Sequence, residues 1–159
     1  MSPWLALLAI VALVIAYWLF AFDTDPQLRS SAPCAAGGGC VVVRVIDGDT
    51  VDMSCPGEGH FRARLINYDT PEIFEPRCAA EAQSGRAATE RLRQMVRTAS
   101  RIDTQLGGYD RYGRRLVRLC LDGRDVGATL VAEGLAHRYN GGRRPDWCAL
   151  LAERTIKTR

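Results

Sequence analysis

The sequence predicts an α+β fold, a five-stranded OB-type β-barrel with about three helices, preceded by one N-terminal transmembrane or signal helix. Three observations lead to this prediction. An unbroken apolar run opens the chain, five later segments have the composition and alternation of strands, and one segment after the third strand has the period of an amphipathic helix. Five strands that are interrupted and followed by helices match the OB barrel.

The N-terminal segment, residues 1–22, contains an uninterrupted apolar run of 19 residues from Trp4 to Phe22. As a helix rising about 1.5 Å per residue, this run nearly spans a hydrocarbon core of about 30 Å, so we expect a membrane segment rather than a buried core helix. A retained anchor and a cleaved signal peptide both remain open. The anchor is favoured because the run is longer than a signal core, follows no basic region and has no small-x-small cleavage site close behind it.

Residues 23–39 are rich in Asp, Ser, Pro, Ala and Gly, and are predicted to be a flexible tether that buries little apolar surface. Residues 40–159 then form the folded domain. Beyond residue 28 the chain carries all 21 basic residues and, once Asp23 and Asp25 are excluded, 16 acidic ones, a net charge of +5. This balance suits a polyanionic partner, although many mildly basic domains bind no nucleic acid.

The folded domain begins with a predicted meander of three strands. Residues 40–46 are rich in β-branched side chains, residues 50–55 alternate apolar and polar side chains, and Asp47-Gly48 between them is a strong hairpin signal. After a Pro-Gly-Glu-Gly turn, three apolar residues alternate with two arginines over residues 61–65, which predicts the third strand.

An amphipathic helix is predicted next, because apolar residues in residues 86–99 recur with the spacing i, i+4, i+7 and i+8. Two more strands, residues 101–106 and 115–121, are expected around a loop at Gly107-Gly108.

Two short helices complete the prediction. Asp125 can cap a helix that ends at Gly134, and Asp146, which follows Pro145, can cap a last helix through residue 151.

The six cysteines all follow the apolar segment, and their even number suits an oxidising compartment. If Asp47-Gly48 is a two-residue turn, the strand register places Cys40 opposite Cys55. Directly opposed residues have Cβ atoms about 4.5–5.5 Å apart, near the reach of a disulfide, so this pair is the best disulfide candidate. Free buried cysteines remain the alternative. For the other four, pairing of Cys78 with Cys148 and of Cys34 with Cys120 is a guess with little support.

Three residues are candidate metal ligands. Asp49 at the end of the first hairpin and Asp69 at the end of the third strand can supply two carboxylates, the oxygen ligands that Ca²⁺ favours. Thr70 precedes a proline and is pushed toward an extended backbone, so its carbonyl is available as a third ligand. An EF-hand is disfavoured because loop position 6 is Asp52 rather than glycine. Ordinary turn chemistry remains the alternative for either aspartate motif alone.

Three further residues are candidates for catalysis. Glu72 is close in sequence to the metal candidates and can take a proton from a water. Arg64 in the third strand and Arg114 after a Tyr-Gly turn can make bidentate contacts to a phosphate that gains charge in a transition state. Each alone could be a solvated surface residue, and their conjunction with two aspartates suggests phosphodiester chemistry. This chemistry needs no histidine, so His60 and His137 are expected to be surface or structural residues.

Together, these segments resemble the signature of the staphylococcal-nuclease-like (thermonuclease) family. The matching motifs are Asp-Gly-Asp-Thr at residues 47–50, Arg-x4-Asp-Thr-Pro-Glu at residues 64–72 and Asp-x-Tyr-Gly-Arg at residues 110–114. They occur in the family's order and at similar spacing, and the likeness covers about residues 40–139. It implies a five-stranded OB barrel with three helices that binds one Ca²⁺ and cleaves DNA and RNA, preferring single-stranded or fraying substrate and leaving 3′-phosphates.

The resemblance also implies a role for each matching residue. The family's calcium ligands are matched by Asp49, Asp69 and the carbonyl of Thr70. The general base and the two arginines that hold the scissile phosphate are matched by Glu72, Arg64 and Arg114.

The chain departs from the family pattern in two places. Arg111 stands where lysine is expected beside the tyrosine, and Arg111 with Tyr112 can still bind substrate by gripping a phosphate and stacking on a sugar or base. Tyr139 is the one tyrosine where a pair of aromatics is expected, which leaves base preference open. Nearby arginines either compensate as phosphate contacts or form a solvated basic loop: Arg138, Arg143 and Arg144.

The main hypothesis is a Ca²⁺-dependent, sugar-non-specific endonuclease that acts on single-stranded DNA and RNA, with no protein partner implied. Its domain is expected in the periplasm or outside the cell, held to the membrane by the N-terminal helix, or secreted if that segment is cleaved. One alternative is a non-catalytic OB-type module that binds nucleic acid. Another is a membrane-anchored scaffold for protein assembly.

Overall fold

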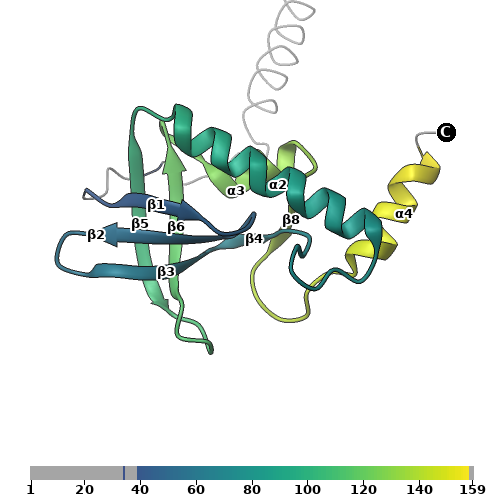
Figure 1. The fold of residues 1–159 in the computed structure, drawn as a ribbon, viewed down its shortest axis with the longest axis horizontal. Helices are drawn as coiled ribbons and strands as arrows, with labels where there is room; N and C mark the ends of the chain where they lie inside the picture. Colours follow the sequence, from purple (N-terminus) through teal and green to yellow (C-terminus); the bar gives the residue numbers. More distant parts are fainter. Residues whose placement is uncertain (1–33, 35–38, 158–159) are drawn as a thin grey trace, which may run out of the picture. The chain divides into compact units, whose positions relative to one another are not determined.

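The computed structural model describes Cys34 and residues 39–157, drawn as a ribbon in Figure 1. The predicted membrane segment, residues 1–22, lies outside the described residues, and so does the tether 23–39 except for Cys34 and Gly39. Within the described part, every helix is too short or too polar to cross a membrane.

The described chain is an α+β domain, as predicted. Its elements in chain order are β1 (Val41–Val45), β2 (Thr50–Cys55), β3 (Gly59–Leu65), β4 (Asn67–Asp69), α2 (Ala79–Thr98), β5 (Ile102–Tyr109), β6 (Arg115–Leu121), β7 (Arg124–Asp125), α3 (Val126–Ala132), β8 (His137–Tyr139) and α4 (Trp147–Lys157). The five predicted strands correspond to β1, β2, β3, β5 and β6. The short strands β4, β7 and β8 were not predicted.

The main sheet has the strand order β1-β2-β3-β6-β5, with β7 beside β6, and β4 and β8 form a separate two-stranded sheet. Neighbouring strands are antiparallel except β3 and β6, which are parallel. In Figure 1, β5 and β6 run across the direction of β1, β2 and β3, and α2 lies along one side of the sheet. No pairing among the described strands joins β1 to β5. The strand order is consistent with an OB-like fold, whereas the predicted closure into a barrel is not observed.

The β1–β2 hairpin differs from the prediction at its turn and agrees with it at its far end. The N–H of Ile46 donates to the carbonyl of Thr50 at 3.0 Å, which leaves residues 47–49 in the turn rather than the two predicted. The strand register shifts between Val42 and Arg44, where a β-bulge places one extra residue in β1. Because the bulge offsets the longer turn, the predicted opposition of the two cysteines still holds.

All three proposed disulfides are present. Cys40 bonds to Cys55 across the hairpin, with Cα atoms 4.1 Å apart. The other two bonds link distant parts of the chain, and they join Cys78 to Cys148 and Cys34 to Cys120. Every described cysteine is therefore bonded.

α2 begins at Ala79, earlier than the predicted residue 86. Its first turns bury Glu81 and Gly85 rather than apolar side chains, so the apolar period that predicts the rest of the helix is missing there. A carboxylate oxygen of Glu81 accepts a hydrogen bond of 2.7 Å from the N–H of Arg77, just before the helix. This contact satisfies a backbone donor at the helix N-terminus.

The predicted caps of the two later helices are confirmed. Asp125 accepts a hydrogen bond from the N–H of Ala128 at 2.8 Å, and Gly134 follows the end of α3 in a left-handed conformation. Asp146 caps α4 through the N–H of Ala149 at 3.2 Å. α4 runs to Lys157, beyond the predicted residue 151.

Two strand boundaries were wrong. The pair Gly107-Gly108 lies inside β5, where it forms an irregularity in the pairing with β6, rather than in a loop. Asp69 does not end the third strand. β3 ends at Leu65, β4 begins at Asn67, whose φ is 73°, and Asp69 is the last residue of β4. Asparagine tolerates this left-handed conformation better than most residues.

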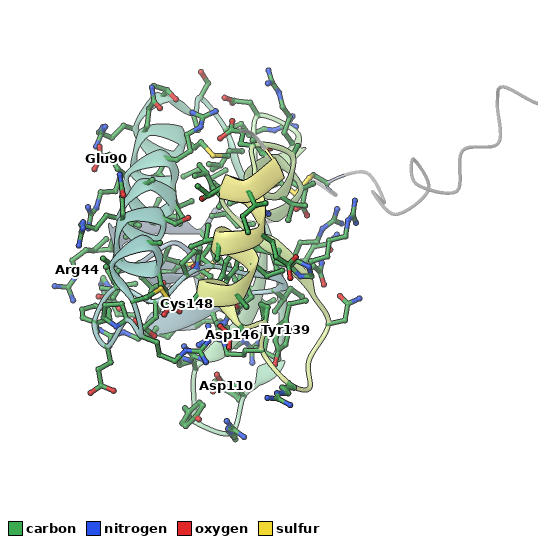
Figure 2. The ribbon with its side chains drawn as sticks, turned by 90° about the vertical axis from the view of Figure 1, so that its right-hand side faces the viewer. Arg44, Glu90, Asp110, Tyr139, Asp146 and Cys148 are labelled. Atoms are coloured by element: carbon green, nitrogen blue, oxygen red, sulfur yellow. A yellow bond between two sulfur atoms is a disulfide. The ribbon has the colours of Figure 1, made fainter. Side chains whose placement is uncertain are left out.

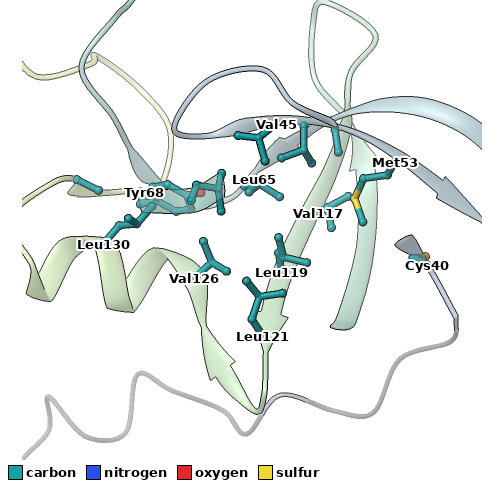
Figure 3. Packing of buried hydrophobic residues seen from close by; sticks show 14 of the residues in the cluster. Cys40, Val45, Met53, Leu65, Tyr68, Val117, Leu119, Leu121, Val126 and Leu130 are labelled. Atoms are coloured by element: carbon teal, nitrogen blue, oxygen red, sulfur yellow. The ribbon is translucent and has the colours of Figure 1, made fainter. Parts of the chain in front are cut away.

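The core lies between the main sheet and the helices, and Figure 3 shows its packing. Tyr68 is the largest fully buried side chain, and it sits where β4 passes α3. Other members with less than 2% exposure come from β2, β3, β6, α2 and α3: Val51, Met53, Leu65, Val117, Leu92, Val126 and Leu130.

We expect Gly127→Ala to reduce the free energy of unfolding by about 1–3 kcal/mol, as overpacking does in well-packed cores. A Cβ at Gly127 would lie 2.3 Å from Cδ1 of Tyr68, which has no room to move. Urea unfolding measures the change. Gly108→Ala is the control, because a Cβ there meets no atom within 4 Å. Equal stability of the two variants would contradict the packing argument.

Candidate active site

Two buried carboxylates form the centre of the site. Asp49 ends the turn of the first hairpin and is 3% exposed, and Asp69 ends β4 and is 1% exposed. Unpaired, two such charges would be costly to bury. Their hydrogen-bond partners therefore decide whether they can remain ionised.

Arg64, on β3, lies between the two carboxylates. Its terminal nitrogens are 3.1 Å from Oδ2 of Asp49 and 3.3 Å from Oδ1 of Asp69. The same guanidinium donates to the carbonyls of Leu65 at 2.5 Å and Tyr68 at 3.0 Å. Its side chain is 9% exposed, so it acts here as a buried counter-ion with both terminal nitrogens engaged.

The C-terminal segment supplies two more partners, which the sequence did not place in the metal site. The guanidinium of Arg144 contacts Oδ1 of Asp69 through Nε and lies 3.6 Å from Oδ2 of Asp49 through a terminal nitrogen. The indole N–H of Trp147 donates to Oδ2 of Asp69 at 2.9 Å. Trp147 is buried, whereas the side chain of Arg144 is half exposed.

Thr70 is held against Asp49. Its N–H and its hydroxyl each donate to Oδ2 of Asp49 at 3.1 Å, and the hydroxyl of Thr50 donates to Oδ1 at 3.2 Å. These contacts bring the backbone of Thr70 to the carboxylate pair. A ligand role for its carbonyl stays a prediction.

The electrostatic balance of the cluster affects Asp49 most. Burial raises the pKa of Asp49 to about 6, although the nearby guanidinium of Arg64 lowers it. Burial also raises the pKa of Tyr68 well above its usual value near 10, so the phenol stays neutral and donates to the carbonyl of Gly48 at 3.1 Å. This bond ties the hairpin turn to β4 and so fixes one aspartate relative to the other.

Glu72 lies on the loop after Thr70 and beside the cluster. One carboxylate oxygen, Oε1, accepts hydrogen bonds from the N–H groups of Ile73 at 2.8 Å and Phe74 at 3.0 Å. Among the contacts of the described residues Oε2 is left for another partner. Partial burial lowers the pKa of Arg144, but Asp69, Asp49 and Glu72 together raise it. Glu72 therefore acts on the guanidinium that also contacts the two aspartates.

The loop that carries Glu72 is placed by its packing on α2. A Cβ on Gly85 would lie 2.6 Å from the carbonyl oxygen of Pro71 and 3.0 Å from that of Glu72. Only glycine lets the helix approach the loop this closely.

The turn between β5 and β6 carries a second group of site residues, and Figure 2 labels Asp110, the first residue of this turn. The N–H and Nε of Arg114 donate to the carboxylate of Asp110 at 2.9 and 2.7 Å. Burial raises the pKa of Asp110, but hydrogen bonds from Arg114 and Tyr112 lower it overall. Arg111 donates to the hydroxyl of Tyr112, whose ring is 68% exposed and lies beneath both guanidinium groups.

Arg114 and Arg64 approach β6 from different elements. Arg64 lies opposite Leu116 in the β3–β6 pairing, and Arg114 directly precedes β6. An open groove of about 510 Å³ runs beside Arg114, and Phe61, Arg62 and Tyr112 help to line it. No contact in the described part of the chain joins this turn to the carboxylate cluster.

The structure therefore brings Asp49, Asp69, Thr70 and Arg64 into one cluster with Glu72 beside it, and it places Arg114, Arg111 and Tyr112 on a neighbouring turn. Arg144 was predicted only as a phosphate contact or solvated residue, and Trp147 was not predicted at all. The guess that Cys78 bonds to Cys148 could have located Trp147, because it brings the neighbour of Trp147 close to the loop after Asp69.

The cluster offers carboxylate oxygens from two elements, the donor set that hard divalent cations prefer. A guanidinium that is held at one end and free at the other, as in Arg114, can bind an anionic group. The carboxylate of Glu72, beside the cluster, can accept a proton. Together they are suited to chemistry on a phosphate ester.

Comparisons with known proteins agree with this geometry. Residues 62–151 match the family described as staphylococcal nuclease homologue. A thermonuclease of Staphylococcus intermedius is 30% identical over 129 residues, which cover 81% of this chain and 74% of that protein. A thermonuclease of Staphylococcus hyicus is 27% identical over 82% of this chain and 76% of its own length. Endonuclease YhcR of Bacillus subtilis (strain 168) is 31% identical over 62% of this chain and 9% of its own length.

We expect Arg64→Met to lower the free energy of unfolding by about 3–5 kcal/mol at pH 7, because it leaves buried carboxylates without their shared counter-ion. Arg44→Met is the matched control. Its ion pair with Asp52 is exposed and should contribute less than about 1 kcal/mol. Chemical denaturation of both variants measures the difference, and a loss for Arg64→Met no larger than that for Arg44→Met would contradict its counter-ion role.

Proposed function

The chain belongs to the staphylococcal nuclease homologue family and is a phosphodiester-hydrolysing nuclease, and we propose that it is a Ca²⁺-dependent endonuclease that cleaves single-stranded DNA and RNA outside the cytoplasm. The observation that carries this proposal is the buried pair Asp49 and Asp69, which Arg64 bridges. Endonuclease and thermonuclease relatives support a nucleic-acid substrate.

The donor set at the cluster supports a hard cation. Asp49 and Asp69 would hold it, with Thr70 positioned beside Asp49 to contribute its carbonyl. When bound, the cation would supply positive charge to a phosphate oxygen and to a water molecule. Arg144 now contacts both aspartates, and its half-exposed side chain can withdraw toward solvent to admit a cation.

The chain's own residues supply the remaining functions. Arg114, anchored through Nε to Asp110, can direct its terminal nitrogens to a phosphate and stabilise charge as it grows on the equatorial oxygens. Glu72, whose Oε1 is fixed by two backbone N–H groups, can accept the proton of the attacking water at Oε2. Arg64, which contacts both carboxylates, would hold the cluster together and add positive charge beside the bound phosphate.

The substrate class follows from the surface beside these residues. The exposed ring of Tyr112, near the guanidinium groups of Arg111 and Arg114, is a surface on which an unpaired base or sugar can stack. Bases inside a duplex are not accessible to such a ring. This supports a preference for single-stranded DNA and RNA. The family resemblance in turn supports the proposal that cleavage leaves 3′-phosphates.

The location outside the cytoplasm is supported by the three disulfides, which are typical of oxidising compartments. We propose that the apolar N-terminal segment either anchors the nuclease to the membrane or directs its secretion. N-terminal sequencing of the exported protein separates the two, since a mature start after Phe22 identifies a cleaved signal peptide.

We expect the purified full chain to cleave single-stranded DNA and RNA with Ca²⁺ and to stop when a chelator is added. Glu72→Gln should lower the rate about 10²–10⁴-fold, the usual contribution of a general base, while substrate binding persists. Glu90→Gln, an identical change at an exposed position of α2, is the control. Binding of nucleic acid by the wild type without Ca²⁺-dependent cleavage would overturn the proposed reaction.

Cation binding should weaken as the pH falls below about 6. The pKa of Asp49 is raised to about 6, so below this pH a proton competes with the cation for the carboxylate. The affinity should fall by up to about tenfold per pH unit for one competing proton.

The stability of the cation-free fold changes with pH in the opposite direction to the cation affinity. The folded pKa of Asp49 lies above the unfolded value of about 3.9, so protonation of this group stabilises the cation-free fold as the pH falls from about 6 toward 4. Titration calorimetry with Ca²⁺ between pH 5 and 8, together with unfolding of the cation-free protein, tests both directions. A pH-independent affinity would contradict the assignment of Asp49.

A further inference from the structure

We propose that Trp147 is a positioning residue of the metal site, which orients the carboxylate of Asp69 through its indole N–H and is itself held in place by the Cys78–Cys148 disulfide. This inference rests on the proposed function, because it assumes that Asp69 is a cation ligand. It assigns a task to the C-terminal segment that no motif in the sequence indicates.

The contact between Trp147 and Asp69 fixes one carboxylate oxygen. The indole N–H donates to Oδ2 at 2.9 Å, and both residues are almost fully buried, at 3% and 1% exposure. Oδ1 is the oxygen that Arg64 and Arg144 contact. The two oxygens of Asp69 therefore have different partners, and rotation of the carboxylate would break contacts on both sides.

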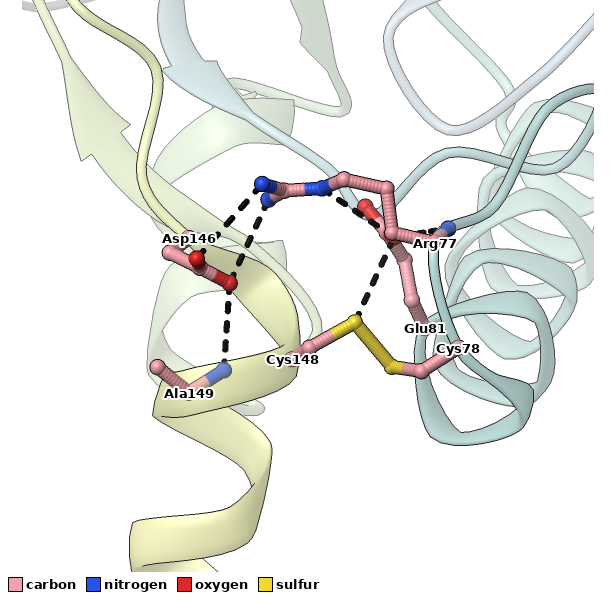
Figure 4. The surroundings of a disulfide bond; sticks show 6 residues. All are labelled: Arg77, Cys78, Glu81, Asp146, Cys148 and Ala149. Atoms are coloured by element: carbon pink, nitrogen blue, oxygen red, sulfur yellow. Dashed lines mark hydrogen bonds and ion pairs between the residues drawn. A yellow bond between two sulfur atoms is a disulfide. The ribbon is translucent and has the colours of Figure 1, made fainter.

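The disulfide fixes the backbone on which Trp147 is carried. Cys148 directly follows Trp147 and is bonded to Cys78 at the start of α2, 70 residues away in the sequence. Figure 4 shows this bond with its surroundings. A sulfur of the bond lies 3.7 Å from Oε2 of the buried Glu81, and both cysteines are half-buried at the N-terminal end of α2.

Two further contacts hold the same end of α4. The guanidinium of Arg77 pairs with Asp146 at 3.3 Å, and Asp146 caps the N–H of Ala149 at 3.2 Å. The residues before and after Trp147 are therefore both tied, one to Arg77 and one to Cys78. Because Arg77 and Cys78 follow the loop of Glu72, the segment is tied to the strand-to-helix connection that begins at Asp69.

Trp147 also contacts the strand that pairs with β4. Its ring meets that of His137 edge-on, with centroids 6.5 Å apart, and His137 lies opposite Asp69 in the β4–β8 pairing. Movement of the indole is thus restricted on the side of β8 as well. The hydrogen bond to Asp69 is therefore preorganised rather than formed on binding.

Groups that hydrogen-bond to a metal ligand orient it and tune its affinity, and their loss typically costs about 10–100-fold in metal affinity or activity. Trp147→Phe would keep an aromatic ring there and remove the N–H donor. Oδ2 of Asp69 would then lose this partner, and only the contacts of Oδ1 with Arg64 and Arg144 would orient the carboxylate. A residue that only filled space would have no such effect on cation binding.

The experiment measures the Ca²⁺ affinity of the purified full chain by titration calorimetry, with the thermal midpoint recorded for each protein. Trp147→Phe should raise the Kd for Ca²⁺ by about tenfold, the lower end of the range for second partners of metal ligands. Thr129→Val is the control, since it removes a hydrogen bond of similar kind, from the half-buried hydroxyl of Thr129 to the carbonyl of Asp125, which are not residues of the proposed site. It should lower the thermal midpoint and leave the Kd unchanged.

A second pair of variants tests the disulfide. Removing the bond with Cys78→Ala and Cys148→Ala should also raise the Kd, and adding Trp147→Phe to that variant should raise it by less than tenfold, because both changes act on one contact. Removing the bond between Cys34 and Cys120, which spans 86 residues instead of 70, should leave the Kd unchanged.

The outcomes separate this inference from the proposed function. If the wild-type chain binds no Ca²⁺, the proposed cation is wrong. If the wild type binds Ca²⁺ and Trp147→Phe binds it equally well, Trp147 has a structural role only and the inference is overturned. If the two disulfide variants change the Kd equally, the bond between Cys78 and Cys148 has no special part in holding Trp147.

Discussion

The buried charge at Arg64 is the constraint on which the site depends. Two carboxylates from different elements can lie side by side out of water only if a cation lies between them, and the guanidinium on β3 provides it. The planar group also donates to two backbone carbonyls, so it fixes the chain as well as the charges. The hairpin turn, β4 and the C-terminal segment all converge on this one side chain and its two partners.

Local signals predicted the parts of the fold that depend on neighbouring residues. Strand alternation located β2, and capping residues located the starts of α3 and α4, because these features act over one or two turns of chain. The start of α2 was missed for a physical reason. Its first turns bury Glu81 and Gly85, so the buried face there is polar or small and leaves no apolar period to detect.

The residues of the candidate site also differ in whether a local sequence signal predicts them. Asp49 and Asp69 could be picked out because each sits in a short motif at the end of a predicted strand, and the structure brings them together through Arg64. No local pattern distinguishes Trp147 from any buried tryptophan, because its contact with Asp69 joins residues 78 positions apart, and only the proposed bond between Cys78 and Cys148 pointed to its neighbourhood. Whether these residues bind a cation and perform catalysis stays a prediction.

The β-bulge in the first hairpin shows that a disulfide across two strands does not determine their register along the whole hairpin. The bond between Cys40 and Cys55 holds the strand ends together, but it does not determine whether the extra residue lies in the bulge or in the turn. Moving that residue from the bulge to the turn would reverse the facing of the strand residues between them, Arg44 and Val45, and leave the bond intact. An intact bond between Cys40 and Cys55 therefore does not report the strand register next to the turn that carries Asp49.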